Sequence, residues 1–142
     1  SSGLVGSEMC IRDSFRTCDA FLVEKIYLCG ITAKPPSNDI RKSALGATKS
    51  VSWSYVKETI NVIKKLKKED YHIVAVEQTE NSTFLNDFLT KKPKAFIFGH
   101  EVDGISQDVL NMCDQVLEIK QYGTKHSLNI SVCAGIVISK CI

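Results

Sequence analysis

The chain has 142 residues, a length that suits one domain built around one hydrophobic core. Hydrophobic residues make up 44% and charged residues 24%, the balance of an ordinary soluble domain, and a net charge of +2 is too mildly basic to indicate nucleic-acid binding alone. The longest apolar runs, such as residues 133–138, are far too short to span a bilayer. No basic segment followed by an apolar one opens the chain, so we expect no export signal, no membrane partner and a cytoplasmic location, provided that the N-terminus is native.

The cysteines and histidines favour neither a disulfide framework nor a metal site. No two of the six cysteines are close enough for a CxxC pair, and Cys18, Cys29 and Cys133 stand among apolar neighbours. This pattern predicts buried thiols in a reducing compartment. The three histidines show no metal-ligand spacing with cysteines or carboxylates, so we expect no metal.

The first fourteen residues look foreign to the rest of the chain. Residues 1–5 resemble an expression-vector linker, and residues 8–14 resemble translated sequencing-adapter sequence. A native but poorly ordered terminus is the alternative interpretation. We therefore expect residues 1–14 to be a non-native or disordered segment and residues 15–142 to form the domain.

The first half of that domain is predicted to mix short helices with one strand. A short helix, a strand, a loop with consecutive prolines and a helical turn are predicted at residues 15–23, 25–31, 34–38 and 39–45. Ser54 is then predicted to cap a longer helix. Along that helix, apolar residues fall at helical spacing with lysines opposite, at Val56, Ile60, Ile63 and Leu66.

The second half alternates more regularly. A strand, a short helix, a buried strand, a helix and a strand are predicted at residues 71–76, 82–89, 94–98, 106–112 and 115–119. This alternation predicts an α/β fold with a mostly parallel sheet covered by helices on both faces. Residues 128–142 are ambiguous from pattern alone, because their β-branched residues favour a strand. A capping Ser127 and the small Ala134 and Gly135 suit a packed helix instead.

The buried strand at residues 94–98 runs directly into a glycine-containing loop. Open α/β sheets bind ligands at such junctions, outside the carboxyl ends of their strands. Gly99 and Gly104 would let the backbone pass close to a ligand, and Glu101 stands between them. Alone, this pattern is more often a generic turn with a solvated carboxylate.

A second loop, which leads into residues 127–129 (Ser-Leu-Asn), favours the functional interpretation of the first. Ser127 could simply cap a helix, and Asn129 could bond the loop backbone. In a ligand site, both side chains would also stand over a pocket rimmed by backbone N–H and C=O groups, which can grip an adenine edge and a ribose. The chain has no GxGxxG phosphate-binding loop, which disfavours a Rossmann enzyme.

Residues 98–106 and 119–138 resemble, in this order and spacing, the second and third motifs of the SpoU–TrmH family of RNA ribose methyltransferases. The resemblance covers residues 15–142 and implies a C-terminal trefoil knot, with the last segment a helix that threads it. It also implies a homodimer that binds S-adenosylmethionine in the knot. Such proteins transfer the methyl group to a ribose 2′-hydroxyl of tRNA or rRNA.

The resemblance assigns residues to the reaction and to the cofactor. The catalytic candidates are Arg16, Glu101, Ser127 and Asn129. The cofactor-binding candidates are Phe98, Gly99, Glu101, Gly104, Ile119, Gln121, Gly123, Ser127, Leu128, Asn129 and Val132. Because a guanidinium is effectively always protonated, we assign Arg16 first to gripping a phosphate and stabilising the forming alkoxide, with direct base action as the alternative.

Two departures from the family pattern bear on activity. The first motif, Asn-x-Gly, should stand shortly before residues 16–17, but Cys10 occupies the asparagine position. Residues 5–7 look like a remnant of that motif, with Leu4 in the place of asparagine. Lys120 replaces a proline, and we expect it to loosen the loop and lower cofactor affinity. The alternative function is therefore a catalytically impaired knot domain that binds RNA or cofactor.

Overall fold

The computed structural model describes residues 2–4, 8–29, 51–79, 82–99, 104–123 and 128–141, and only the backbone of residues 2–4 and 8–12. The strands β1 to β7 are Ser2–Leu4, Lys25–Cys29, Ser52–Val56, His72–Val76, Thr83–Phe84, Lys94–Phe98 and Gln115–Glu118. The helices α1, α3, α4 and α5 are Glu8–Ala20, Thr59–Lys68, Gln107–Met112 and Ile130–Cys141, and a 3₁₀ turn, η2, is Leu85–Asp87.

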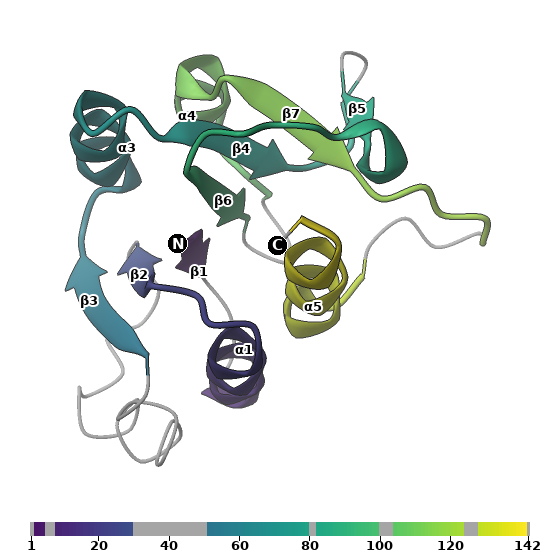
Figure 1. Cartoon of the computed structure of the whole chain (residues 1–142), viewed down its shortest axis with the longest axis horizontal. Helices are drawn as coiled ribbons and strands as arrows, with labels where there is room; N and C mark the ends of the chain where they lie inside the picture. The colour runs from purple at the N-terminus through teal and green to yellow at the C-terminus, as the bar shows by residue number, and fades with distance from the viewer. Residues whose placement is uncertain are drawn as a thin grey trace.

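The strands form one sheet in the order β3-β2-β1-β6-β4-β7-β5, and every described pair is parallel. β1 lies between β2 and β6 and so joins the two parts of the sheet (Figure 1). Val76 at the end of β4 is in register with Phe98 of β6 and Leu117 of β7. The loops that follow these three strands therefore start side by side at one edge of the sheet.

The sheet separates two hydrophobic cores. Phe96 and Phe98 of β6 belong to the cluster that includes α1 and α5, whereas Ala95 and Ile97 belong to the cluster that includes α3 and α4. Figure 1 shows these helix pairs on opposite sides of the sheet. Successive side chains of a strand point to opposite faces of the sheet, so a strand that is buried on both faces needs apolar residues at every position. The predicted α/β fold, a mostly parallel sheet covered by helices on both faces, is confirmed.

Most elements of the second half lie where the sequence predicted them. β4, β6, α4 and β7 differ from their predicted ranges by a residue or less at each end. Ser106 caps α4, since its hydroxyl accepts from the Val109 N–H at 3.4 Å. The ambiguous last segment is a helix, as the family resemblance implied. None of the described helices is long and apolar enough to cross a bilayer.

The predicted helix cap at Ser54 is wrong. Ser54 lies inside β3, and the helix begins only at Thr59, with Glu58 as its N-cap residue. Trp53, Tyr55 and Val56 have the aromatic and β-branched side chains that favour strands. β3 also pairs with β2 along its whole length, a long-range contact that helical spacing cannot reveal.

Two other predicted elements have different limits. The helix predicted over residues 82–89 is wrong at its start, because Thr83–Phe84 form β5 against β7 and only the η2 turn that follows is helical. The helix predicted from Phe15 begins earlier, at Glu8. The domain boundary at residue 15 stays a prediction. The loop and helical turn predicted at residues 34–38 and 39–45 lie outside the described residues.

Candidate functional site

The two ends of the loop after β6, at Gly99 and Gly104, lie close together. A Cβ at Gly99 would lie 2.5 Å from the carbonyl carbon of Gly104 and 2.7 Å from the Ile105 nitrogen, closer than real Cβ atoms come to backbone. Gly104 has φ +66°, in the left-handed region that favours glycine. Both glycines are therefore required by the closure of the loop. The sequence analysis had assigned them only to the approach of a ligand.

A carboxylate from the neighbouring strand end holds this closure. Glu77 follows β4, and its Oε2 accepts a hydrogen bond from the Ile105 N–H at 2.9 Å. The backbone N–H of Glu77 donates to the Leu117 carbonyl of β7 at 3.0 Å. The same Oε2 lies 2.9 Å from where a Cβ of Gly104 would stand, so a side chain there would collide with it. Glu77 thus ties the loop after β6 to the end of β7.

Glu77 is not among the residues that the sequence pattern predicts for the site. A single acid after a strand usually means a solvated turn, and no motif singled it out. Its position was the available signal, since it directly follows a predicted strand of the half that carries the glycine loop. In a parallel sheet, residues at that position gather at the ligand-binding edge.

The start of α5 completes this edge of the sheet. The Asn129 Oδ1 accepts from the Ser131 N–H at 2.9 Å and from the Ser131 hydroxyl at 2.6 Å, so Asn129 caps the helix. The carbonyl of Asn129 accepts from the Cys133 N–H at 2.9 Å. Leu128 and Val132 are exposed, at 38% and 52% of their surface.

One hydrophobic cluster underlies these loops and the helix start. Phe98 of β6, Ile119 after β7 and Ile130 of α5 all belong to it. Burial first, and the negative charge of Glu77 second, raise the pKa of the Cys133 thiol to about 11. Val76 at the end of β4 and Cys133 of α5 also pack against this cluster, so the end of β4 and the start of α5 are close in space. Segments that follow β4, β6 and β7 therefore converge on α5.

The remaining predicted residues are distributed around this edge. Ile119 and Gln121 are half-buried after β7, and Gly123 is exposed, with no atom within 4 Å of where its Cβ would stand. Glu101 and Ser127 lie outside the described residues. The roles assigned to all of these residues stay predictions.

Arg16 is exposed on α1. That helix packs along α5, and the methyl group of Thr17 lies 3.8 Å from where a Cβ of Gly135 would stand. Arg16 therefore belongs to the helical layer on one face of the sheet. Its assigned contact with RNA stays a prediction.

The described part of the chain offers no metal site and no disulfide. No group of three or more His, Cys, Asp or Glu side chains in it could hold a metal ion. Its cysteines are free thiols at Cys18, Cys29, Cys113, Cys133 and Cys141.

The described strands thus form a parallel sheet within an α/β fold. Its carboxyl edge carries a closed glycine loop and the capped start of the helix α5. The sequence of the chain matches the SpoU rRNA Methylase family over residues 13–139. The chain therefore belongs to the SpoU family, as the two loop motifs had indicated.

Its relatives are RNA-modifying enzymes. The chain is 31% identical over 127 residues to the tRNA (guanosine(18)-2′-O)-methyltransferase of Aquifex aeolicus, which covers 87% of this chain and 58% of that protein. The solved A. aeolicus TrmH/SpoU tRNA modifying enzyme has a TM-score of 0.81 and 27% identity, over 98% of this chain and 70% of the other. An AdoMet-bound rRNA methyltransferase from Sinorhizobium meliloti has a TM-score of 0.86 and 21% identity, over 98% and 53% of the two chains. The chain spans about half the length of the curated relatives it matches.

Proposed function

We propose that this chain transfers the methyl group of S-adenosylmethionine to a ribose 2′-hydroxyl of tRNA or rRNA. The proposal is carried by the closed loop after β6, to which Glu77 is hydrogen-bonded, and by the start of α5, which packs in the same cluster as Phe98 of β6. Family membership supports the same reaction. The A. aeolicus relative is named for a tRNA and the S. meliloti neighbour for an rRNA, so both classes of substrate remain in the proposal.

In this proposal the cofactor pocket lies at the carboxyl edge, between residues 98–104, 119–123 and 127–133. Three features support it: the close backbone approach at Gly99, the open space beside Gly123 and the capped start of α5. S-adenosylmethionine carries a sulfonium and no phosphate, which fits a chain without a GxGxxG loop. We propose further that α5 threads a trefoil knot here, and that no metal takes part.

The reaction is an in-line displacement. The ribose oxygen forms a bond to the methyl carbon while the carbon–sulfur bond breaks, and the hydroxyl proton leaves near the transition state. Positioning should supply much of the rate. We assign Arg16 to the neighbouring phosphate and the forming alkoxide, and Glu101, Ser127 and Asn129 to holding the reacting groups. With an RNA substrate, we place the protein in the cytoplasm.

We propose a homodimer in which α5 contributes to the interface. Val132 and Ile136 lie four residues apart on one side of α5 and are 52% and 38% exposed, and Leu128 just before the helix is 38% exposed. Exposed apolar residues on one helix face mark an interaction surface. A two-fold axis there would place Arg16 of one subunit near the pocket of the other.

Mixing two inactive variants tests the shared site. An Arg16→Ala chain and a Ser127→Ala chain should each be inactive, and their mixture should regain activity in the dimers that restore one complete site. Activity in the mixture no greater than in either variant would argue against a site shared between subunits.

The reaction itself is tested with labelled S-adenosylmethionine and, separately, purified tRNA and rRNA. After complete digestion, the label should appear in a 2′-O-methylnucleoside. Label in a base would contradict the proposal. Binding of S-adenosylhomocysteine and RNA without transfer would favour the alternative, a catalytically impaired binding domain. The altered first motif and Lys120 are the observations behind that alternative.

A further inference from the structure

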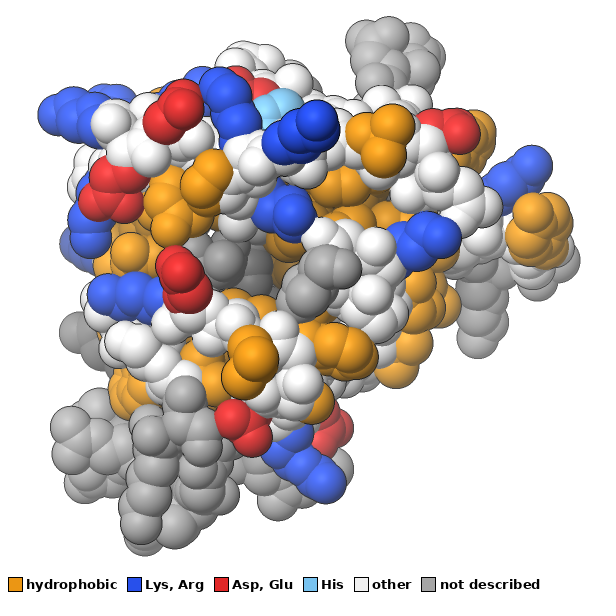
Figure 2. All heavy atoms as spheres, in the orientation of Figure 1, with side chains coloured by type: hydrophobic (Ala, Val, Ile, Leu, Met, Phe, Trp, Pro, Cys, Tyr) orange, Lys and Arg blue, Asp and Glu red, His pale blue; other side chains and the backbone are white. Residues whose placement is uncertain are grey.

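Two aromatic side chains surround one lysine at the carboxyl edge of the sheet. The Lys120 Nζ lies 5.7 Å from the ring centre of Phe84 and 5.5 Å from that of Tyr122. Phe84 belongs to β5 and lies in register with Glu118 of β7, which brings it to the segment that carries the other two residues. In Figure 2, hydrophobic (orange) and basic (blue) side chains lie together at the surface in the region beyond β5 and β7 of Figure 1.

Packing does not account for these rings. Tyr122 is 87% exposed and Phe84 is 41% exposed, so the tyrosine ring gains almost none of the stabilisation that burial of an aromatic side chain gives. Neither ion pair of the described residues involves Lys120. Glu118, the acid nearest in sequence, accepts a hydrogen bond from the Ser82 hydroxyl at 3.4 Å. The lysine is thus held near two rings with its charge open to solvent.

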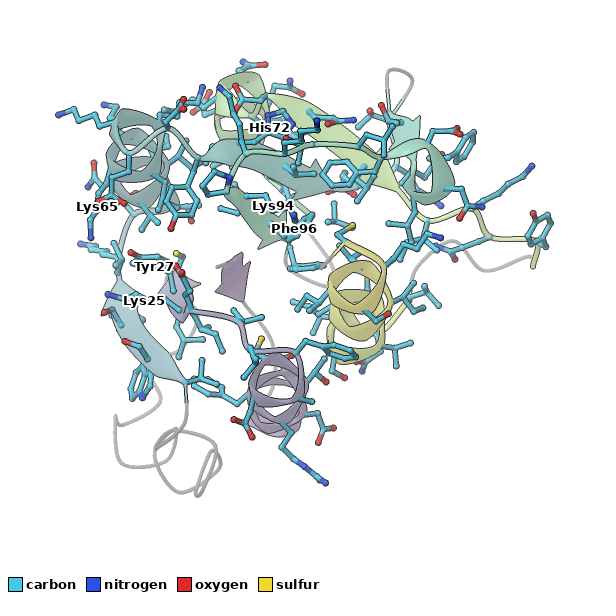
Figure 3. All side chains as sticks on the ribbon, in the orientation of Figure 1. Lys25, Tyr27, Lys65, His72, Lys94 and Phe96 are labelled. Atoms are coloured by element: carbon cyan, nitrogen blue, oxygen red, sulfur yellow. The ribbon has the colours of Figure 1, made fainter. Side chains whose placement is uncertain are left out.

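A second contact between lysines and an aromatic ring, with two lysines on one tyrosine, shows a purely structural arrangement. The Nζ atoms of Lys25 and Lys65 lie 4.9 Å and 5.9 Å from the ring centre of Tyr27 (Figure 3). Tyr27 is only 6% exposed and packs in the core beneath α3. Its ring has no free face for a ligand, whereas that of Tyr122 has one.

We propose that Phe84, Lys120 and Tyr122 form a contact site for one nucleotide of single-stranded RNA next to the target ribose. The base stacks on an exposed ring, and its phosphate faces the Lys120 ammonium. Proteins bind single-stranded RNA by this combination of aromatic stacking and positive charge. The proposal rests on the proposed function, because Lys120 and Tyr122 belong to the segment 119–123 that borders the proposed cofactor pocket. Positive charge favours RNA over a second copy of this chain as the occupant.

Fluorescence anisotropy with a labelled 12-nucleotide single-stranded RNA of mixed sequence tests the stacking. Tyr122→Ala should weaken binding about tenfold, the typical loss of one stacked base, and Tyr122→Phe should bind like the native protein because it keeps the ring. Tyr55→Ala is the matched control, since Tyr55 is 51% exposed on β3, the outer strand on the far side of the sheet from β5. Equal affinities of the Tyr122→Ala and native proteins would overturn the proposal.

The role of the Lys120 charge is tested separately, by the salt dependence of RNA binding. Lys120→Gln should reduce the slope of log affinity against log salt by about 0.7, the value for one phosphate contact on a single strand. An unchanged slope would overturn the role of the lysine. The dissociation constant for S-adenosylhomocysteine is measured beside it, because equal losses for cofactor and RNA would assign these side chains to the cofactor pocket instead.

Size-exclusion chromatography adds a third outcome. If Tyr122→Ala converts a dimer into monomers, the rings contact a second copy of this chain and the proposal is wrong. If the native protein methylates RNA and Tyr122→Ala retains full RNA affinity, this proposal alone fails. If the native protein binds RNA through Tyr122 but transfers no methyl group, the RNA site stands and the proposed reaction fails.

Discussion

The two edges of this sheet use their polar side chains in different ways. At the amino edge, these side chains pair across the starts of β4 and β7. The His72 Nε2 lies 3.0 Å from the Gln115 Oε1, and the Asp114 Oδ2 accepts from the Ile73 N–H at 2.8 Å. At the carboxyl edge, Glu77 instead holds a loop closed, while Tyr122 is exposed. A parallel sheet thus has one edge whose polar groups maintain the fold and one that is free to carry a site.

Gly99→Ala should have the largest effect. The added methyl carbon would lie 2.5 Å from the backbone of Gly104, so the loop must move, and a displacement of about 1 Å near reacting groups can lower the rate about a hundredfold. The measurement is single-turnover methyl transfer beside the affinity for S-adenosylhomocysteine. Native values for both quantities would mean that the closed loop is not part of the site.

Asp114→Ala should lower stability and leave the cofactor site intact. The Ile73 N–H at the amino edge would lose its 2.8 Å partner, which costs about 1–3 kcal/mol in the free energy of unfolding. Urea denaturation measures this loss. A change in cofactor affinity as large as the loss of stability would contradict the separation of the two edges.

Glu77→Ala should weaken binding of S-adenosylhomocysteine about tenfold, equivalent to loss of about 1.4 kcal/mol, because the Ile105 N–H loses its acceptor. Glu77→Gln keeps an acceptor oxygen and should retain most of the affinity. Calorimetry compares the three proteins. If both variants lost the same affinity, the negative charge would matter and the hydrogen bond would not.

Part of this contrast is visible in the sequence. The apolar runs that became β4, β6 and β7 have turn residues at their ends, so the positions of these strands, and the edge at which we propose the site, followed from the sequence pattern. The position of β3 did not follow from the pattern, because residues 52–56 form a strand by pairing with β2, and short-range spacing does not encode that contact. The glycines were predicted to admit a ligand, and their closure of the loop emerged only from the position of residues 104–105.

Gly135→Ala is the matched glycine replacement outside the site, and it should stabilise the protein by up to about 1 kcal/mol. Its Cβ would stand 3.8 Å from the Thr17 methyl group, an ordinary contact, within the helix α5. Thermal unfolding measures the shift. A lower melting temperature would mean that α1 and α5 pack more closely than this contact allows.

The smallest expected effect is on the reactivity of Cys133. Burial and Glu77 raise the pKa of this thiol to about 11, so Glu77→Gln should lower the pKa and increase the thiolate fraction at pH 9. Site-resolved alkylation should then be faster at Cys133. Cys113 is the internal control, because burial, a lysine and Asp114 set its pKa of about 11. Equal acceleration at both cysteines would indicate a general loosening of the fold.

Hydrogen–deuterium exchange with S-adenosylhomocysteine tests most directly whether the carboxyl edge is the cofactor site. The account predicts that bound ligand protects peptides covering residues 98–105, 117–123 and 128–133. Peptides at the amino edge, around residues 69–73 and 113–115, should exchange at unchanged rates. Protection centred on the amino edge, or no protection at saturating ligand, would contradict the account.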